Sequence, residues 1–213
     1  MATTPRPRRG PYAKTRGRVE AVGEIAYDVV VEQGHRALTM AEVARRSGLT
    51  DAQLLYHFPS RDHLLVAALE HADGLSRQQR TRGPAADPEA AFARAVNDRL
   101  AAPPVIRLFV TVAAEGTDPE HPAHAWLLAR QREIVVQYAG FLRELQAQGW
   151  AHRDVDPERF ARELMALWDG LQAQWLLDPS LDLGAEVAAG LRALARRDAV
   201  LAREALDAAF ARG

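Results

Sequence analysis

The sequence predicts an all-α protein of about nine helices, with an N-terminal helix-turn-helix domain followed by a larger helical domain. Three observations support this prediction. Apolar residues recur three and four positions apart through most of the 213 residues, which is the spacing of one face of an α-helix. Glycine or proline stands where these periodic segments stop. No segment alternates apolar and polar residues in the way that a half-buried strand does.

The composition indicates a folded protein without cysteine chemistry. Apolar residues make up 48% of the chain, which is enough for a sizeable core. The absence of cysteine excludes disulfides, thiolate catalysis and cysteine-bound metal. There is no uninterrupted apolar run of about 18 residues, and residues 1–17 lack the apolar centre of a signal peptide. We therefore expect a cytoplasmic protein with no membrane partner.

Charge is distributed unevenly along the chain. Residues 1–63 contain ten basic and seven acidic side chains, whereas the remainder contains 17 basic and 21 acidic ones. The N-terminal part is therefore the part expected to face a polyanion. Residues 1–13, with Arg6, Arg8 and Arg9, are expected to form a disordered basic arm. This arm is either a solvated tail or a segment that seeks phosphates or the minor groove.

The first expected helix spans residues 14–33 and ends at Gly34. Its apolar residues lie on one stripe, at Val22, Ile25, Ala26, Val29 and Val30. The glycine that follows is a natural helix terminator.

Three short helices follow within residues 39–72. Thr39 is a good N-cap for the second helix, with Glu42 three residues later, and Gly48 ends it. Thr50 caps a third helix, which Pro59 keeps short. Ser60 is expected to cap a fourth helix, which buries Leu64, Leu65 and Leu69. Two short helices joined by a tight turn that contains glycine form a helix-turn-helix.

A polar connector, Arg77–Asp87, is expected after these helices, and helical periodicity continues beyond it to the end of the chain. The expected C-terminal helices span residues 88–100, from 103 onward, 122–148, 157–177 and 184–211. We therefore predict two domains, residues 14–72 and residues 73–213.

The second and third helices have the sequences LTMAEVARRSGLT at residues 38–50 and DAQLLYHFPSR at residues 51–61. Over about residues 16–72 the chain resembles the DNA-binding domain of the TetR family of transcriptional regulators. In that family a capping Thr precedes an acidic residue, an Ile/Val-Ala pair and a small residue before Gly. A His-Phe pair closes the recognition helix, and Ser-Lys-Glu begins the fourth helix.

Two positions depart from the family pattern. Leu55 stands where the family usually has Tyr, and Tyr56 follows one position later, about 100° further round the helix. This change puts the usual phosphate contact in doubt. The lysine of the fourth helix is Arg61 here, which keeps the charge.

The resemblance implies that the third helix lies in the major groove, where the edges of the four base pairs differ. Gln53 is the best candidate to read a base, Ala52 can touch a thymine methyl group, and Tyr56 and His57 are placed for phosphates or base edges. Helix N-termini capped by Thr39 and Thr50 are expected to face phosphates. Arg45, Arg46 and Arg61 would release counterions. The alternative is that these residues are ordinary helix caps and solvated surface groups, whereas Leu54 and Phe58 belong to the core.

The C-terminal domain is expected to dimerise and to bind an effector. Segments 114–124 and 168–172 are similar to segments of many TetR-type regulators. In the family the last two helices, here about 157–177 and 184–211, pair across a two-fold axis. The last of these is rich in small residues, at Ala188, Ala189, Gly190, Ala195, Ala202 and Ala205. Candidate residues of an effector pocket are Phe109, Thr111, Glu115, Trp126, Tyr138, Trp168 and Gln172, although each is also explained by ordinary packing.

Other functional classes have weaker support. The chain lacks nucleophile-elbow, phosphate-loop and dinucleotide motifs, so we expect neither an enzyme nor a cofactor. Glu32 and His35 form a single E-x-x-H pair where a di-iron site needs two. His121 and His124 are better explained as helix-start residues than as metal ligands. A helical module that sequesters a ligand or binds another protein, and that has lost DNA binding, is a further alternative, supported by Leu55.

The favoured hypothesis is a homodimeric repressor that an unidentified small molecule releases from a palindromic operator. A two-fold dimer would present its recognition helices about one DNA turn apart.

Overall fold

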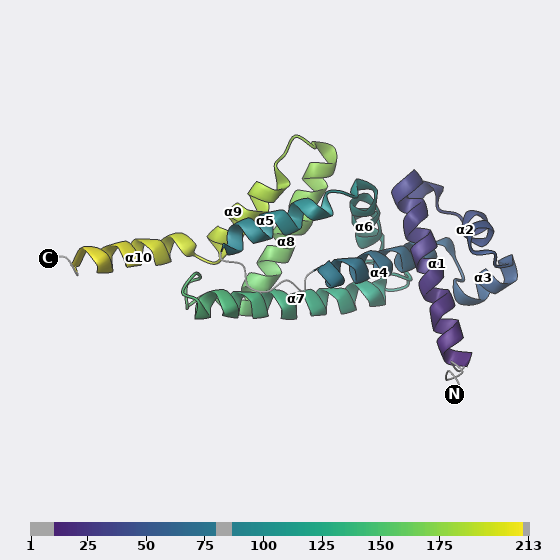
Figure 1. Ribbon diagram of the computed structural model, residues 1–213, viewed down its shortest axis with the longest axis horizontal. Helices are drawn as coiled ribbons and strands as arrows, with labels where there is room; N and C mark the ends of the chain where they lie inside the picture. Colours follow the sequence, from purple (N-terminus) through teal and green to yellow (C-terminus); the bar gives the residue numbers. More distant parts are fainter. Residues whose placement is uncertain (1–10, 80–86, 211–213) are drawn as a thin grey trace, which may run out of the picture.

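The computed structural model describes residues 11–79 and 87–210, which form ten α-helices and one short 3-10 helix without any β-strand (Figure 1). In chain order these are α1 (Pro11–Gln33), η1 (His35–Ala37), α2 (Met40–Ser47), α3 (Asp51–His57), α4 (Arg61–Gln79), α5 (Pro88–Arg99), α6 (Pro103–Glu115), α7 (His124–Ala147), α8 (Pro157–Leu177), α9 (Leu183–Leu194) and α10 (Arg197–Phe210). The prediction of an all-helical fold is confirmed. None of the helices in these ranges has the length and hydropathy needed to span a bilayer.

The N-terminal helices share one apolar core. α1 packs along α4, and α2 and α3 lie on the outer side of this pair (Figure 1). Leu38, Leu54 and Leu64 are completely buried where the helices converge. Gly34, with φ of 83°, turns the chain out of α1 in a conformation that favours glycine.

The same core continues into α6. Leu108 and Val112 of α6 are buried within it, together with Ala123 just before α7. In addition, α4 runs unbroken across the domain boundary expected at residues 72 and 73, and includes Arg77 of the expected connector. The DNA-binding helices are therefore joined to the rest of the molecule by a continuous helix and by shared packing.

The remaining helices form the C-terminal part. α7 packs on α8, α8 on α9, and α9 on α5. Leu142, Phe160 and Leu191 are at most 1% exposed where α7, α8 and α9 meet. Asp87, Asp156 and Asp182 cap the N-termini of α5, α8 and α9 through side-chain oxygens.

The N-terminal boundaries differ from the sequence-based prediction. α1 begins at Pro11, which places residues 11–13 of the expected arm in a helix. Residues 1–10 of that arm lie outside the described residues. The hydroxyl of Ser60, the residue before α4, is hydrogen-bonded to the Nδ1 of His63 (2.9 Å).

The single helix expected over residues 184–211 is wrong, because it divides into α9 and α10 at Arg196. This residue has φ of 53°, in the left-handed region. The carbonyl of Ala195 accepts a hydrogen bond from the backbone N–H of His152 (2.9 Å). Arg197 donates to the carbonyl oxygens of Gly149 and Trp150. These bonds to the loop between α7 and α8 end α9, and α10 then projects away from the other helices (Figure 1).

Candidate functional site

The recognition helix α3 presents a short polar surface held by a buried underside. Leu54 is fully buried and Phe58, just after the helix, is 5% exposed, so both anchor α3 to the core as expected. The opposite side leaves Asp51, Ala52 and Gln53 exposed. A short helix that is anchored on one side can offer its other side to a ligand without unfolding.

The turn before α3 is fixed by local hydrogen bonds. Gly48 ends α2 in the left-handed conformation, with φ of 67°. The Ser47 hydroxyl donates to the carbonyl of Ala44 (3.3 Å) and accepts from the N–H of Leu49 (3.4 Å). These contacts set the angle between the two helices of the helix-turn-helix.

Thr39 and Thr50 are N-caps, as the sequence predicts. The Thr39 hydroxyl accepts from the N–H of Glu42 (3.2 Å), and the Thr50 hydroxyl accepts from the N–H of Gln53 (3.3 Å). Gln53 completes a capping box, because its Oε1 accepts from the N–H of Thr50 (3.1 Å). The candidate base-reading amide is therefore placed at the N-terminus of α3 by its own helix.

The aromatic end of α3 is strongly exposed. The Tyr56 side chain is 83% exposed, and Leu55 is 49% exposed. His57 is half-buried, and its ring lies edge-on to that of Tyr56, with 5.0 Å between the centroids. An exposed phenol beside an imidazole offers two hydrogen-bonding groups to an incoming polyanion.

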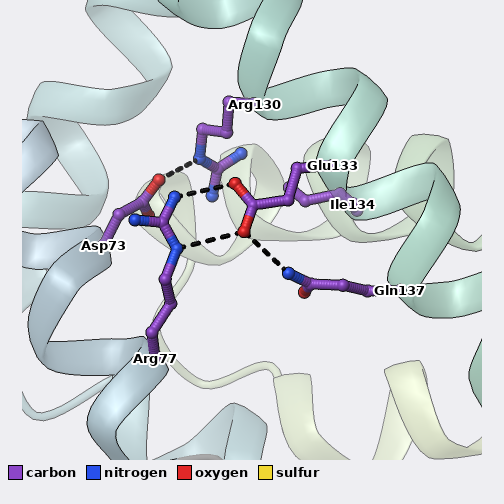
Figure 2. Close-up of a pocket in the computed structure, with 6 residues that line it drawn as sticks. All are labelled: Asp73, Arg77, Arg130, Glu133, Ile134 and Gln137. Carbon is purple, nitrogen blue, oxygen red and sulfur yellow. Dashed lines mark hydrogen bonds and ion pairs between the residues drawn. The ribbon is translucent and has the colours of Figure 1, made fainter.

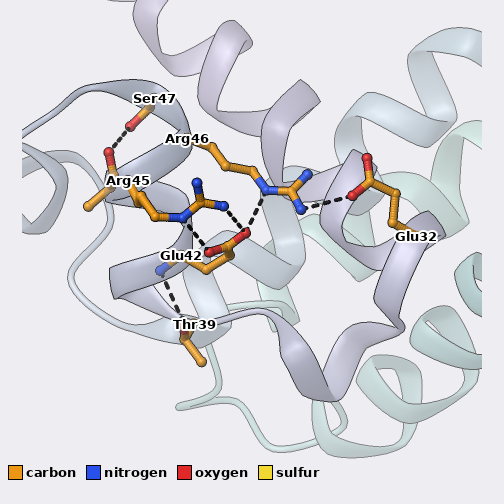
Figure 3. Close-up of polar contacts among 7 residues, drawn as sticks. Glu32, Thr39, Glu42, Arg45, Arg46 and Ser47 are labelled. Carbon is orange, nitrogen blue, oxygen red and sulfur yellow. Dashed lines mark hydrogen bonds and ion pairs between the residues drawn. The ribbon is translucent and has the colours of Figure 1, made fainter.

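The two arginines of α2 share one carboxylate (Figure 3). Glu42 accepts hydrogen bonds from Arg45 (2.7 and 2.9 Å) and from Arg46 (2.7 Å). These bonds lower the pKa of Glu42 to about 2. Arg46 also bonds to Glu32 of α1 (2.8 Å), and its side chain is 21% exposed against 68% for Arg45. Arg46 therefore ties α2 to α1, and Arg45 is the more accessible cation.

Arg61 is turned toward the protein backbone. Its Nε donates to the carbonyl of Leu38 (2.8 Å) and its Nη2 to the carbonyl of His35 (2.7 Å). These bonds hold the segment between α1 and α2 against the start of α4. Of the three predicted phosphate-binding arginines, Arg61 thus has the clearest structural role.

A cavity of about 370 Å³ lies between the two parts of the molecule. Its lining comes from α1 and α4 on one side and from α5 to α8 on the other. Phe109, Trp168 and Gln172, three of the seven predicted pocket residues, line it.

The other four predicted residues lie elsewhere. The Thr111 hydroxyl donates to the carbonyl of Arg107 (2.9 Å), and Glu115 lies near His121 (3.8 Å). Trp126 packs against the core of the N-terminal helices, and Tyr138 packs against Phe92. These four side chains do not line this cavity, although Trp126 lies next to Arg130, which does.

Two charged residues of the cavity were missed by sequence reasoning. Arg130 of α7 donates from Nε to Asp73 of α4 (2.8 Å), and the two side chains are 14% and 17% exposed. The guanidinium carbon of Arg130 lies 4.5 Å from the centroid of the Phe109 ring. Arg130 and Asp73 lie 57 residues apart in the chain, and no local motif joins them.

A second ion pair joins the same helices beside the cavity. Arg77 of α4 donates to both carboxylate oxygens of Glu133 of α7, at 3.1 and 2.8 Å (Figure 2). The Arg77 and Glu133 side chains are 51% and 42% exposed. α4 and α7 are thus connected by one sheltered and one solvated ion pair.

Gln172 is the one buried polar residue among the described residues, at 3% exposure. Its Nε2 donates to Asp169 (3.0 Å), and its Oε1 accepts none of the hydrogen bonds found within residues 11–79 and 87–210. Burial raises the pKa of Asp169, while the charge of Arg130 opposes that shift. The cavity therefore combines aromatic walls, a paired arginine and an amide oxygen open to a donor.

His121 and His124 have other partners. Besides the contact with Glu115, the His121 Nδ1 accepts from the N–H of Ala123 (3.1 Å), and the His124 ring bonds to the carbonyl of Gly116 (3.0 Å). Within the described ranges, no group of three or more His, Cys, Asp or Glu residues is arranged to hold a metal ion.

Residues 24–68 match the sequence model of a family described as bacterial regulatory proteins, tetR family. The HTH-type transcriptional regulator BetI from Rhizobium meliloti is 31% identical over 165 residues, covering 72% of this chain and 75% of that protein. A TetR-family regulator from Rhodococcus sp. has a similar fold, with a TM-score of 0.66, 23% identity and coverage of 84% of this chain and 99% of that one. A protein from Saccharomonospora viridis, solved in complex with choline, has a TM-score of 0.58, 22% identity and coverage of 84% and 94%.

Proposed function

Because the chain belongs to the TetR family and is a DNA-binding transcriptional regulator, we propose that it is a repressor that a small molecule releases from a palindromic operator. The observation that carries the proposal is the exposed surface of α3, anchored by Leu54 and Phe58 and placed by capped helices. The cavity lined in part by α1 and α4 supports the proposal that a small molecule releases the protein from DNA.

In this proposal α3 enters the major groove with its N-terminal turn toward the bases. Gln53 and Ala52 face the base edges, and Tyr56 and His57 contact phosphates or the adjacent bases. The N-termini capped by Thr39 and Thr50 direct backbone N–H groups toward phosphates. Arg45 is the most accessible of the three predicted arginines, because Arg46 and Arg61 hold neighbouring segments of the domain together.

The active species in this proposal is a homodimer formed by the C-terminal helices. On α8, Ala166, Gly170 and Leu177 are exposed at helical spacing. On α9, Ala185, Ala189 and Ala193 are exposed four residues apart. Small side chains let helices approach closely, so α8 and α9 offer a face for a two-fold partner. Of the small residues expected to serve this purpose, Ala188 and Ala195 are buried within the protomer instead.

The effector is proposed to act at the cavity between α4 and α8. Its walls include Tyr27 and Val31 of α1 and Leu69 of α4, so a ligand there touches the DNA-binding helices directly. A ligand that binds one spacing of the two recognition helices better than the other shifts the dimer between them. The structural neighbour from Saccharomonospora viridis was solved with choline, which is a quaternary ammonium ion. Quaternary ammonium ions are therefore one class of ligand to test as effectors of this protein.

Selection from a random pool of DNA duplexes tests the first half of this proposal. The purified full chain is expected to enrich a palindromic sequence, with half-sites about one helical turn apart. Ala52→Glu, which places a negative charge on the exposed surface of α3, should abolish enrichment. Ala125→Glu makes the same change at an exposed position of α7 and should leave enrichment intact.

A ligand-sequestering module is the alternative, which Leu55 at the usual position of Tyr favours. If the wild-type chain enriches no sequence although its helices are folded by circular dichroism, the repressor proposal is wrong and the sequestering function replaces it.

A further inference from the structure

The cavity has one strongly preorganised charged group. Arg130 lies with its guanidinium carbon 4.5 Å from the Phe109 centroid and 5.9 Å from the Trp126 centroid. Both aromatic residues are partly buried against the core of the N-terminal helices, and they hold the guanidinium from α6 and α7. Its carboxylate partner Asp73 lies on α4, the helix that continues into the DNA-binding domain.

The two members of this ion pair are therefore not equivalent. If α4 moves relative to α7, Asp73 leaves with α4, while Arg130 stays between its aromatic neighbours. In that state the sheltered guanidinium keeps only the charge of Asp169, with which it has no direct ion pair among the described residues. An anion that pairs directly with Arg130 is therefore favoured. A ligand cation that replaced Arg130 would instead have to expel a guanidinium from its stacked position.

Other cavity residues suit the same ligand charge. Arg99 of α5 also lines the cavity, with its guanidinium carbon 5.9 Å from the Trp168 centroid. Asp98 lines the cavity as well but is exposed to solvent. The buried Gln172 offers its Oε1 to a hydroxyl or amide donor, and the walls between these groups are apolar, at Leu69, Val105 and Ile106.

We propose that the effector is an organic anion with an apolar body, whose carboxylate takes the place of Asp73 on Arg130. This inference rests on the proposed effector function of the cavity. A carboxylate forms charge-assisted hydrogen bonds with the guanidinium, and the apolar body fills the aromatic part of the cavity. Binding of the anion frees Asp73 and thereby removes the sheltered ion pair between α4 and α7.

The test measures binding without DNA, so that its outcome is independent of operator recognition. Octanoate, octanamide and octyltrimethylammonium have the same apolar chain and differ in charge. Each is titrated into the purified full chain below its micelle-forming concentration, with tryptophan fluorescence and melting temperature as readouts. Octanoate is expected to bind saturably and to raise the melting temperature, and to bind about tenfold or more tighter than octanamide, since its carboxylate is charged.

Variants of the ion pair give opposite predictions for the two ligand charges. Asp73→Asn removes the competitor for Arg130, so octanoate should bind several times more tightly. If a cation replaced Arg130 on Asp73, the same variant would instead weaken binding of octyltrimethylammonium. Arg130→Gln should abolish octanoate binding and Arg130→Lys should retain part of it. Arg77→Gln breaks the neighbouring ion pair outside the cavity and should leave octanoate affinity unchanged.

The proposal is overturned if octyltrimethylammonium or octanamide binds as tightly as octanoate, or if octanoate does not bind at all. It is also overturned if Arg130→Gln, still folded by circular dichroism, binds octanoate like the wild type. Enrichment of an operator from the random pool together with any of these results would leave the repressor function standing and reject only the anionic effector.

Discussion

At the scale of single residues, the arginines of the DNA-binding domain divide into two groups. Arg61 donates to two backbone carbonyls and so holds the segment between α1 and α2. Arg46 donates to two carboxylates and so holds α2 against α1. Among the residues that the structure describes, Arg45 binds only Glu42 of its own helix, and its side chain remains largely exposed. Residue type and spacing suggested three similar cations, but only the tertiary contacts distinguish their roles.

Gln53 has two possible roles, and one substitution separates them. Gln53→Glu preserves an acceptor for the capping box, so the melting temperature should change little. The added negative charge at the N-terminal turn of α3 should lower affinity for the selected duplex about tenfold or more, as expected for loss of a base contact. Affinity is measured by fluorescence anisotropy at constant salt. Unchanged affinity with unchanged stability would show that Gln53 serves only the cap.

Glu42 should contribute to stability in a defined pH range. Its folded-state pKa of about 2 lies below the ordinary value of 4.5, because Arg45 and Arg46 hydrogen-bond its ionised form. The stabilisation is therefore complete above the ordinary pKa and is lost as the pH falls toward the folded-state value. The difference in free energy of unfolding between wild type and Glu42→Gln should thus shrink as the pH falls from about 5 to 2.

Chemical denaturation at a series of pH values measures this difference. Glu24→Gln, which also removes one carboxylate from an exposed helical position, is the matched control variant. A Glu42→Gln difference that stays constant across the range would mean that the shared carboxylate does not contribute in solution.

At the scale of helices, the boundaries set by local chemistry could be predicted and those set by tertiary contacts could not. Thr39, Thr50 and Gly48 cap or end helices through bonds within a few residues, and the sequence identified all three. The break at Arg196 depends on His152 and Trp150, which lie more than 40 residues away in the chain. No feature of residues 184–211 alone indicates it.

The cavity shows the same limit. Phe109, Trp168 and Gln172 could be proposed because aromatic and amide residues in the middle helices are plausible pocket residues. The pairing of Arg130 with Asp73 could not, because the pair depends on how α4 and α7 are placed. Charged residues on two separate helices look like ordinary surface groups until the fold brings them together.

Arg196→Gly tests whether α9 and α10 are separate helices in solution. A non-glycine residue in the left-handed region is strained by roughly 1 kcal/mol, so glycine should raise the free energy of unfolding by up to about that amount. If residues 184–211 instead formed one helix, glycine in its interior would lower stability by about 1 kcal/mol. Thermal unfolding measures the sign, and Arg162→Gly, in the regular helix α8, is the control that should destabilise.

At the scale of the whole molecule, the DNA-binding surface and the cavity lie at two ends of α4. α4 begins at Arg61, which holds the segment before α2, and carries Asp73 at the cavity. The core of the N-terminal helices also joins α1 and α4 to α6, so these helices share their packing with one wall of the cavity. A change in the contacts of Asp73 therefore acts on the element that positions the helix-turn-helix.

Asp73→Asn should imitate the effector in the proposed mechanism. If the Arg130–Asp73 pair belongs to the DNA-bound form, its loss shifts the dimer away from that form and weakens binding to the selected duplex several-fold without any ligand. Linkage then requires that octanoate lower DNA affinity by the same factor by which DNA lowers octanoate affinity. Anisotropy titrations with and without octanoate measure both factors. Glu133→Gln removes the charge that pairs with Arg77 and alters the bond from Gln137 on the same helix. It should have a smaller effect, because exposed ion pairs contribute at most about 1 kcal/mol. Equal effects of the two variants would mean that any tether between α4 and α7 suffices, and that Arg130 and Asp73 are not the sensing pair.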